Sequence, residues 1–313
     1  MSPACEYFSS IEKIHANEEG GIMRKFLILV GVCLLLSGTG FIRAEEGLKV
    51  FISVDMEGIT GVVVSEECSR EGKDYGLFRK LMTLEANAAV EGALAAGATE
   101  IWVRDSHGSA RNILPDLLHE KAKLLRGWSG GFKMMMEGID ESFDAVIFIG
   151  YHAKAGTPDA IIEHTMSGSV MDSSVNGVSL PEAGWNALIA GHYNVPVVFA
   201  AGDTALCNQL KGMFDKIETE SVKTAIGASA VNLHPEAAWR KIRKGVEKSL
   251  REVAQYKPYK LTSPYTLVLT LKYEEMVYNG AFYPGAERTG EWELTYKSDS
   301  ILDIAKAFIW MRK

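Results

Sequence analysis

The sequence predicts an α/β fold, in which a mostly parallel sheet is flanked by helices and a smaller C-terminal α+β lobe follows. Four short apolar runs rich in β-branched residues are separated by helical or loop segments, as in parallel sheets that are covered on both faces. Of the 313 residues, 47% are hydrophobic and 23% are charged. This balance is typical of a globular body and excludes a disordered chain or a multi-span membrane protein.

The N-terminal leader, residues 1–44, has the layout of a secretory signal. Met23 is followed by the basic residues Arg24 and Lys25, an apolar run over 26–36, and small and polar residues before Ala44. The apolar run is shorter than the roughly 20 residues that a spanning helix needs. We therefore expect an upstream segment and a signal peptide within 1–44, a start at Met23, and an exported mature protein without stable membrane insertion. A retained N-terminal anchor is the alternative.

The first half of the mature chain alternates strands with helical segments. A strand is expected over 48–55 and a helix over 75–96, where apolar residues recur at helical spacing and Gly97 suits a C-terminal cap. Further strands are expected over 100–104, 144–150 and 195–201. Polar residues follow each of these strands, at the edge where open parallel sheets bind their ligands.

The second half of the mature chain is predicted to contain a hairpin, helices and a strand in no regular alternation. A hairpin element is expected around Asn176 and Gly177, followed by a helix over 182–193. A charged helix over 235–255, an alternating strand over 265–273 and a closing helix over 300–311 complete the chain. We expect the main α/β domain over 45–225 and the C-terminal lobe over 226–313.

Charge and cysteine content exclude two classes of protein. The 33 basic and 40 acidic residues give a formal charge of −7, so the basic footprint of a nucleic-acid-binding protein is missing. Four cysteines are too few for a disulfide framework. Cys5 and Cys33 lie in the leader, and Cys68 and Cys207 can pair only if folding brings them together, which the sequence leaves open.

Carboxylates and imidazoles follow three of the expected strands. Asp55 and Glu57 are two residues apart and point to the same side of an extended chain. Burying both anions costs several kcal/mol unless a cation lies between them, whereas a solvated strand end is the simpler alternative. His107 and His152 follow the next two strands. Together these residues offer the ligand types of zinc and related divalent metals, so we expect a metal site here.

Two further residues near the strand ends have less specific patterns. Asp203 is interpreted as a helix cap before Thr204. His164 lies twelve residues after His152, beyond a Gly-Thr-Pro turn. An imidazole near a metal-bound water can move protons in amide cleavage, although taken alone His164 is an ordinary surface-loop histidine. No HExxH or Walker motif occurs in the chain, so zincins and P-loop proteins lack their signatures.

Six segments, taken together, resemble the D-aminopeptidase (DppA) family of metallopeptidases. They occur in the family's order with similar spacing, and the resemblance extends over 48–313. The segments are SVDMEGITG (53–61), VRDSHG (103–108), GYHAKAGTP (150–158), EHTM (163–166), PEAGWNA (181–187) and VPVVFAAGD (195–203).

The resemblance implies a zinc-dependent aminopeptidase that hydrolyses the N-terminal peptide bond of short, D-amino-acid-containing peptides at a dinuclear site. It implies two zinc ions per subunit, a catalytic role for His164, and a homo-oligomer of the decameric kind. Two departures from the family pattern are Pro181, where glycine is common, and Glu163, in a loop that is one residue longer. The metal ligands that the resemblance assigns are Asp55, Glu57, His107, His152 and Glu182.

Two alternative functions use the same residues. One is another metal-dependent amidase or esterase on the same ligands. The other is an exported metal- or peptide-binding protein without catalysis. Turnover of dipeptides with a free or a blocked amino terminus, measured together with metal stoichiometry, distinguishes the three.

Overall fold

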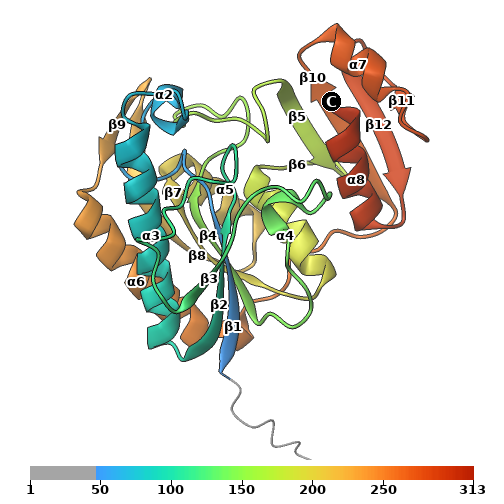
Figure 1. Ribbon diagram of the computed structural model, residues 1–313. Coiled ribbons are helices and arrows are strands. Elements are labelled where there is room, and N and C mark those ends of the chain that lie inside the picture. Colours follow the sequence, from blue (N-terminus) through green and yellow to red (C-terminus); the bar gives the residue numbers. More distant parts are fainter. Residues whose placement is uncertain (1–46) are drawn as a thin grey trace, which may run out of the picture. The chain divides into compact units, whose positions relative to one another are not determined.

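A seven-stranded sheet forms the centre of the computed structural model, which describes residues 47–313 (Figure 1). The expected signal segment lies outside the described residues. The strands run in the order β3-β2-β1-β4-β7-β8-β9, and all neighbouring pairs are parallel except β8 and β9. The four strands that the sequence predicts between residues 48 and 201 are confirmed as β1, β2, β4 and β7. The bounds are β1 Leu48–Val54, β2 Ala98–Asp105, β3 Ala122–Leu125, β4 Ala145–Tyr151, β7 Val197–Asp203, β8 Glu218–Ile226 and β9 Ser229–Asn232.

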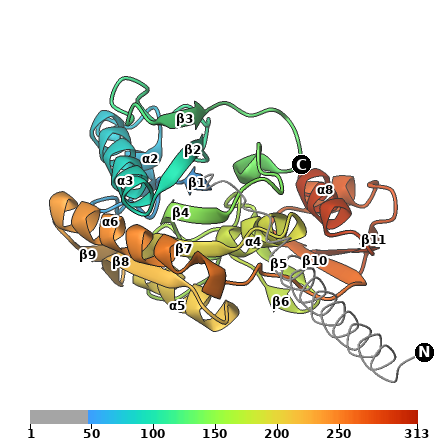
Figure 2. The same cartoon turned by 90° about the horizontal axis from the view of Figure 1, so that it is seen from below.

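Helices cover both faces of this sheet, as the apolar character of its strands predicts. Helices α3 (Tyr75–Ala95) and α6 (Pro235–Arg251) pack against each other on one face, and α4 (Glu182–His192) and α5 (Thr204–Met213) lie against the other (Figure 2). Side chains of β1 alternate between the two layers: Val50 and Ile52 join the α3–α6 cluster, while Phe51 joins the opposite one. Asp203 caps α5 by accepting a hydrogen bond from the Leu206 amide at 2.8 Å, as expected.

A smaller lobe carries an antiparallel sheet in the order β11-β12-β10-β5-β6. The expected hairpin is confirmed as β5 and β6, and the turn residues Asn176 and Gly177 have φ values of 53° and 78°, as a type I′ turn requires. The rings of Trp185 and Phe308 stack at 4.3 Å and join α4 to this lobe. The elements are β5 Val170–Val175, β6 Val178–Ser179, β10 Tyr265–Leu271, α7 Glu274–Gly280, β11 Glu287–Arg288, β12 Glu293–Ser298 and α8 Ile301–Met311.

The division between the two sheets differs from the expected boundary at 225/226. Strand β9 and helix α6 follow that boundary, yet both complete the larger sheet: β9 pairs with β8, and Ile242 and Val246 of α6 lie in the core beside α3. In turn, β5 from the middle of the chain pairs with β10. The reason is that strand pairing and an apolar helix face, rather than sequence adjacency, decide which elements pack together.

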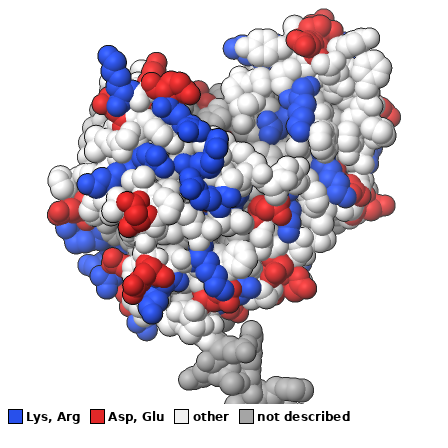
Figure 3. Space-filling model, viewed as in Figure 1, with Lys and Arg blue, Asp and Glu red and all other residues white. Residues whose placement is uncertain are grey.

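The outer surface of the described part is mixed in charge. Acidic and basic side chains are interspersed over the face in Figure 3, and a notch separates the main body from the smaller lobe. None of the helices in 47–313 combines the length and the apolar character needed to cross a membrane. Cys68 and Cys207 are both buried and unpaired within this range, so they do not form the disulfide that the sequence left open.

Candidate metal centre

The residues predicted for the metal site meet at the carboxyl edge of the larger sheet. Asp55 and Glu57 follow β1, His107 follows β2 and His152 follows β4. Strands β1 and β4 are neighbours, but the connections from them run to opposite sides of the sheet. Such a switch point leaves a crevice between the diverging loops, which is where open α/β sheets place their ligands.

Two glycines allow the loops after β1 and β4 to approach each other. The Gly58 amide donates to the Gly150 carbonyl at 2.7 Å, and the Asp55 amide donates to the Ile149 carbonyl at 2.8 Å. A Cβ atom on Gly58 would lie 1.9 Å from the Tyr151 carbonyl oxygen. Gly150 has a φ of +69°, and a Cβ there would lie 2.2 Å from the Asp55 carbonyl oxygen. Only glycine fits at both positions, so these residues set the spacing between Asp55 and His152.

One group of ligand atoms consists of Asp55, His152 and Glu182. His152 Nε2 lies 3.6 Å from Asp55 Oδ2 and 3.4 Å from Glu182 Oε1. His152 Nδ1 donates to the Ala153 carbonyl at 3.0 Å, which leaves the lone pair of the neutral ring on Nε2. This Nε2 atom is buried and has no hydrogen-bond partner among the described residues. A histidine that is oriented by a carbonyl through its other nitrogen is the usual arrangement of a metal ligand.

A second group surrounds His107. Its Nδ1 atom lies 2.9 Å from Glu57 Oε2 and 3.2 Å from Asp55 Oδ1, while Nε2 donates to the Cys68 carbonyl at 3.0 Å. The neutral ring therefore directs the Nδ1 lone pair toward the carboxylates. Asp55 presents one oxygen to each histidine, so its carboxylate is shared between the two groups of ligand atoms.

His164 lies over the carboxylates and is more accessible than the other candidate residues. Its Nδ1 atom donates to the Ile162 carbonyl at 2.9 Å, and Nε2 lies 3.5 Å from Glu182 Oε1. The His164 ring stacks on that of His152 with centroids 4.1 Å apart. Its side chain is 23% exposed, compared with 1% for His152. Its free nitrogen thus faces both the carboxylates and the solvent-connected side of the site.

Electrostatics show that this cluster needs positive charge. Burial alone raises the pKa of Glu182, yet His152 and His164 outweigh burial and lower that pKa to about 2. Burial likewise lowers the pKa of His152, but Glu182, Glu57 and Asp55 raise it to about 10. Burial and the charge of Glu57 also raise the pKa of Asp55, so without an ion the cluster holds extra protons on Asp55, His107 and His152. Divalent cations can replace these protons, so metal binding would release them.

The donor set fits zinc. Zinc binds imidazole nitrogens and carboxylate oxygens. The lone pair of His152 Nε2, a buried atom without a hydrogen-bond partner among the described residues, could bind such an ion. Candidate ligand atoms lie within 4.8 Å of one another in three overlapping groups. The groups are Asp55, His152 and Glu182; Glu57, His152 and His164; and Glu57, Cys68 and His107.

A cavity of about 310 Å³ opens above these ligands. This volume is at the lower end of the range for small-molecule sites. Besides the candidate residues, its walls include Trp128, Met134, Met166 and Arg312.

Lys223 of β8 was not expected from the sequence. It is buried, and its ammonium group donates to the Val62 carbonyl at 2.6 Å, to the Ile59 carbonyl at 3.2 Å and to the Glu57 carbonyl. Lys223 therefore holds the loop that carries Glu57. A single lysine in a strand gives no sequence signal for this role, because its partners are main-chain carbonyls more than 160 residues away.

A serine-hydrolase pattern in the chain lacks the required context. Residues 127–131 read GWSGG, which matches GxSxG. The segment is an irregular loop after β3, and Ser129 Oγ donates to Glu137 Oε2 at 2.7 Å. A nucleophile elbow instead lies on a strand-to-helix turn beside its histidine, so this match does not indicate a serine nucleophile.

Comparison with known proteins gives three matches. A family model described as D-aminopeptidase matches residues 48–310. A D-aminopeptidase from Bacillus subtilis (strain 168) is 33% identical over 270 residues, which are 84% of this chain and 96% of that protein. The solved structure of the Zn-dependent D-aminopeptidase DppA from Bacillus subtilis, described as a self-compartmentalizing protease, superimposes with a TM-score of 0.81. It is 29% identical, and the match covers 84% of this chain and 96% of that one.

Proposed function

The chain belongs to the D-aminopeptidase family and is therefore a metallo-aminopeptidase, and on that premise we propose that it hydrolyses the N-terminal peptide bond of short peptides containing D-amino acids at a site for two zinc ions. The observation that carries this proposal is the position of Asp55 between two histidines. Asp55, His152 and Glu182 would hold one ion, and Glu57 and His107 would hold the other, with Asp55 bridging them.

The bound zinc ions would supply Lewis acidity, which acidifies water and polarises a peptide carbonyl. The chain itself supplies the proton carrier. In the neutral ring of His164, Nδ1 keeps its proton because it donates to the Ile162 carbonyl, so Nε2 is free to accept one. We propose that Nε2 takes a proton from the attacking water and returns it to the departing amine. Direct attack by the same nitrogen, or stabilisation of the oxyanion, are the alternative roles.

The site would also favour a substrate with a free amino terminus. Asp55, Glu57 and Glu182 all line the cavity, and the free amine would bind to an ion that they hold or to a nearby carboxylate. A blocked amino terminus cannot make this interaction. The site would therefore cleave after the first residue of a peptide.

The test is turnover of D-alanyl-D-alanine by the zinc-loaded protein, with N-acetyl-D-alanyl-D-alanine as the matched control. We expect release of D-alanine from the free dipeptide only. Equal cleavage of the blocked peptide would favour a general amidase, and two bound ions without any turnover would favour a binding protein.

We further propose that the protein is exported. The support is the basic and apolar layout of residues 23–44, followed by a body that folds as its own unit. We expect cleavage after Ala44, so mass spectrometry of protein recovered from outside the cytoplasm should show an N-terminus at Glu45. An N-terminus that retains residues 23–44 would indicate an anchor.

We also propose a homo-oligomer, with a decamer as the expected form. Its support is the relative described as self-compartmentalizing and the exposed aromatic residues of the smaller lobe, among them Tyr278, Phe282 and Trp310. Light scattering of the purified protein should give the mass of ten chains. A monomer mass at micromolar concentration would contradict the proposal.

A further inference from the structure

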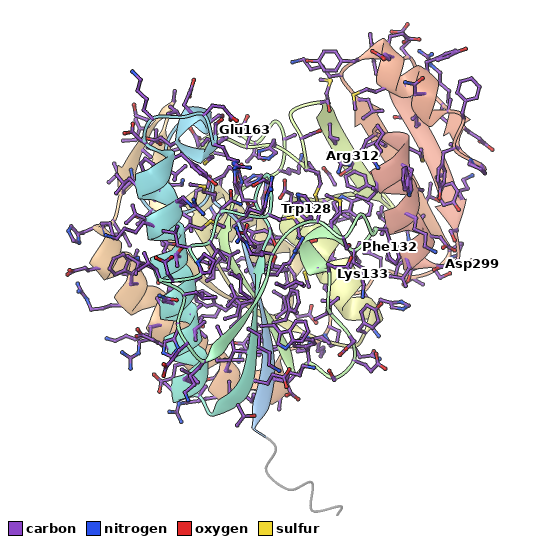
Figure 4. All side chains as sticks on the ribbon, in the orientation of Figure 1. Trp128, Phe132, Lys133, Glu163, Asp299 and Arg312 are labelled. Atoms are coloured by element: carbon purple, nitrogen blue, oxygen red, sulfur yellow. The ribbon has the colours of Figure 1, made fainter. Side chains whose placement is uncertain are left out.

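Arg312 lines the same cavity as the metal ligands but comes from the smaller lobe. It is the residue directly after α8, and its guanidinium group lies over the Phe308 ring at 5.5 Å. Figure 4 shows Arg312 and Trp128 on either side of the region between the lobes. The position follows from the fold, because α8 packs with α4, the helix that begins at Glu182.

The charge of Arg312 has no direct partner in the described part of the chain. Its Nε atom is buried without a hydrogen bond, and Nη2 reaches only the Met134 sulfur at 3.6 Å. No ion pair joins the guanidinium group to a carboxylate of residues 47–313. Burial lowers the pKa of Arg312, whereas Glu182, which lines the same cavity, is the acidic group that favours its charged form and raises its pKa. A half-buried cation with an unpartnered buried Nε atom gains stability when an anion binds it.

The cavity thus has two chemically different parts. One contains the carboxylates and histidines, which would hold the zinc ions and through them the free amine of the substrate. The other contains Arg312, which is the only lysine or arginine among the described residues that line the cavity. A peptide with both termini free has an amine at one end, which a bound ion can hold, and a carboxylate at the other. The cavity offers a partner to each end.

We infer that Arg312 binds the C-terminal carboxylate of the substrate and so selects dipeptide-sized peptides. This inference rests on the proposed function and adds the substrate's second anchor. A guanidinium group donates two parallel hydrogen bonds to a carboxylate. An extended chain advances about 3.3–3.6 Å per residue, so a cavity of about 310 Å³ accommodates only a short peptide between its two parts.

The test compares D-alanyl-D-alanine with its C-terminal amide on the zinc-loaded protein, in the wild type and in Arg312→Gln and Arg312→Lys. We expect Arg312→Gln to lower kcat/KM for the free acid by about ten- to hundredfold, because a charge-assisted hydrogen-bonded pair is lost. The same substitution should change kcat/KM for the amide less than threefold. Arg312→Lys should recover part of the loss in kcat/KM for the free acid. Lys313→Gln is the control, since it removes a neighbouring exposed charge.

A binding measurement separates this inference from the proposed function. Calorimetry would use a hydrolysis-resistant analogue of D-alanyl-D-alanine, in which CH₂ replaces the peptide carbonyl, and its C-terminal amide. Tighter binding of the acid that depends on Arg312 supports the inference even if no peptide is cleaved. If Arg312→Gln weakens the binding of both analogues equally, or weakens the binding of neither, Arg312 does not bind the carboxylate. This conclusion holds whatever the enzyme hydrolyses.

Discussion

Asp55 Oδ2 lies 3.6 Å from His152 Nε2, a buried nitrogen that lacks a hydrogen-bond partner within residues 47–313. The other oxygen of Asp55 lies 3.2 Å from His107. A carboxylate that is shared in this way joins the two groups of ligand atoms. The following predictions depend on this arrangement and on the buried contacts that hold it.

Asp55→Asn should remove metal. The amide lacks the negative charge that a bridging ligand supplies, so both ions should bind more weakly, and elemental analysis of purified protein should show less than half of the wild-type zinc. Asp215→Asn is the matched control, because Asp215 is exposed and forms an ion pair with the surface residue Lys257. Full zinc content in Asp55→Asn would contradict the bridging role.

His164→Ala should retain zinc but lose turnover. Proton transfer by a positioned imidazole contributes about 10²- to 10⁴-fold to a rate, so kcat should fall about a hundredfold or more. His192→Ala removes an exposed histidine at the end of α4 and should behave as the wild type. Near-normal kcat in a zinc-loaded His164→Ala enzyme would refute the catalytic assignment.

Lys223→Met should loosen the loop that carries Glu57. The substitution leaves buried carbonyl groups of residues 57–62 without their donor, which should lower the free energy of unfolding by about 2–4 kcal/mol. Urea denaturation measures this change, and zinc titration should show weaker binding. The control is Lys241→Met, whose ammonium forms an exposed ion pair with Glu220. A change below about 0.5 kcal/mol, the usual size for surface substitutions, would show that Lys223 does not hold the loop.

Glu85→Gln should change how stability depends on pH. Burial raises the pKa of Glu85 to about 8, and its Oε1 accepts a hydrogen bond from the Thr60 amide. The folded protein therefore keeps the proton up to about pH 8, while the unfolded chain releases it near its ordinary pKa of about 4.5. Between these values the unfolded state binds fewer protons, so the contribution of Glu85 to stability falls by about 1.4 kcal/mol per pH unit.

Urea denaturation at pH 5, 6, 7 and 8 tests this sign. The free energy of unfolding of Glu85→Gln should decline less over this interval than that of the wild type. Parallel curves for the two proteins would mean that Glu85 titrates normally in the folded state.

The sequence predicted the parts of the site that depend on local pattern. Apolar strands followed by Asp55, His107 and His152 indicated a metal site, because parallel strands place their carboxyl ends at one edge. Glu182 came only from the family resemblance, since an acidic residue in the first turn of a helix is common. The confirmed hairpin at Asn176 likewise followed from local turn chemistry.

Residues that depend on distant contacts could not be predicted. Lys223 and Arg312 reach the site through the packing of β8 and α8, and neither lies near a motif. The pairing of β5 with β10 joins segments about 90 residues apart, for which the sequence holds no local signal. These long-range contacts also explain why the order of elements along the chain does not give the division between the two sheets.

Diffraction data collected on both sides of the zinc absorption edge test the central claim most directly. We predict two anomalous peaks, one beside Asp55, His152 and Glu182 and the other beside Glu57 and His107, with Asp55 between them. A single peak, or zinc bound elsewhere in zinc-saturated crystals, would contradict the dinuclear site.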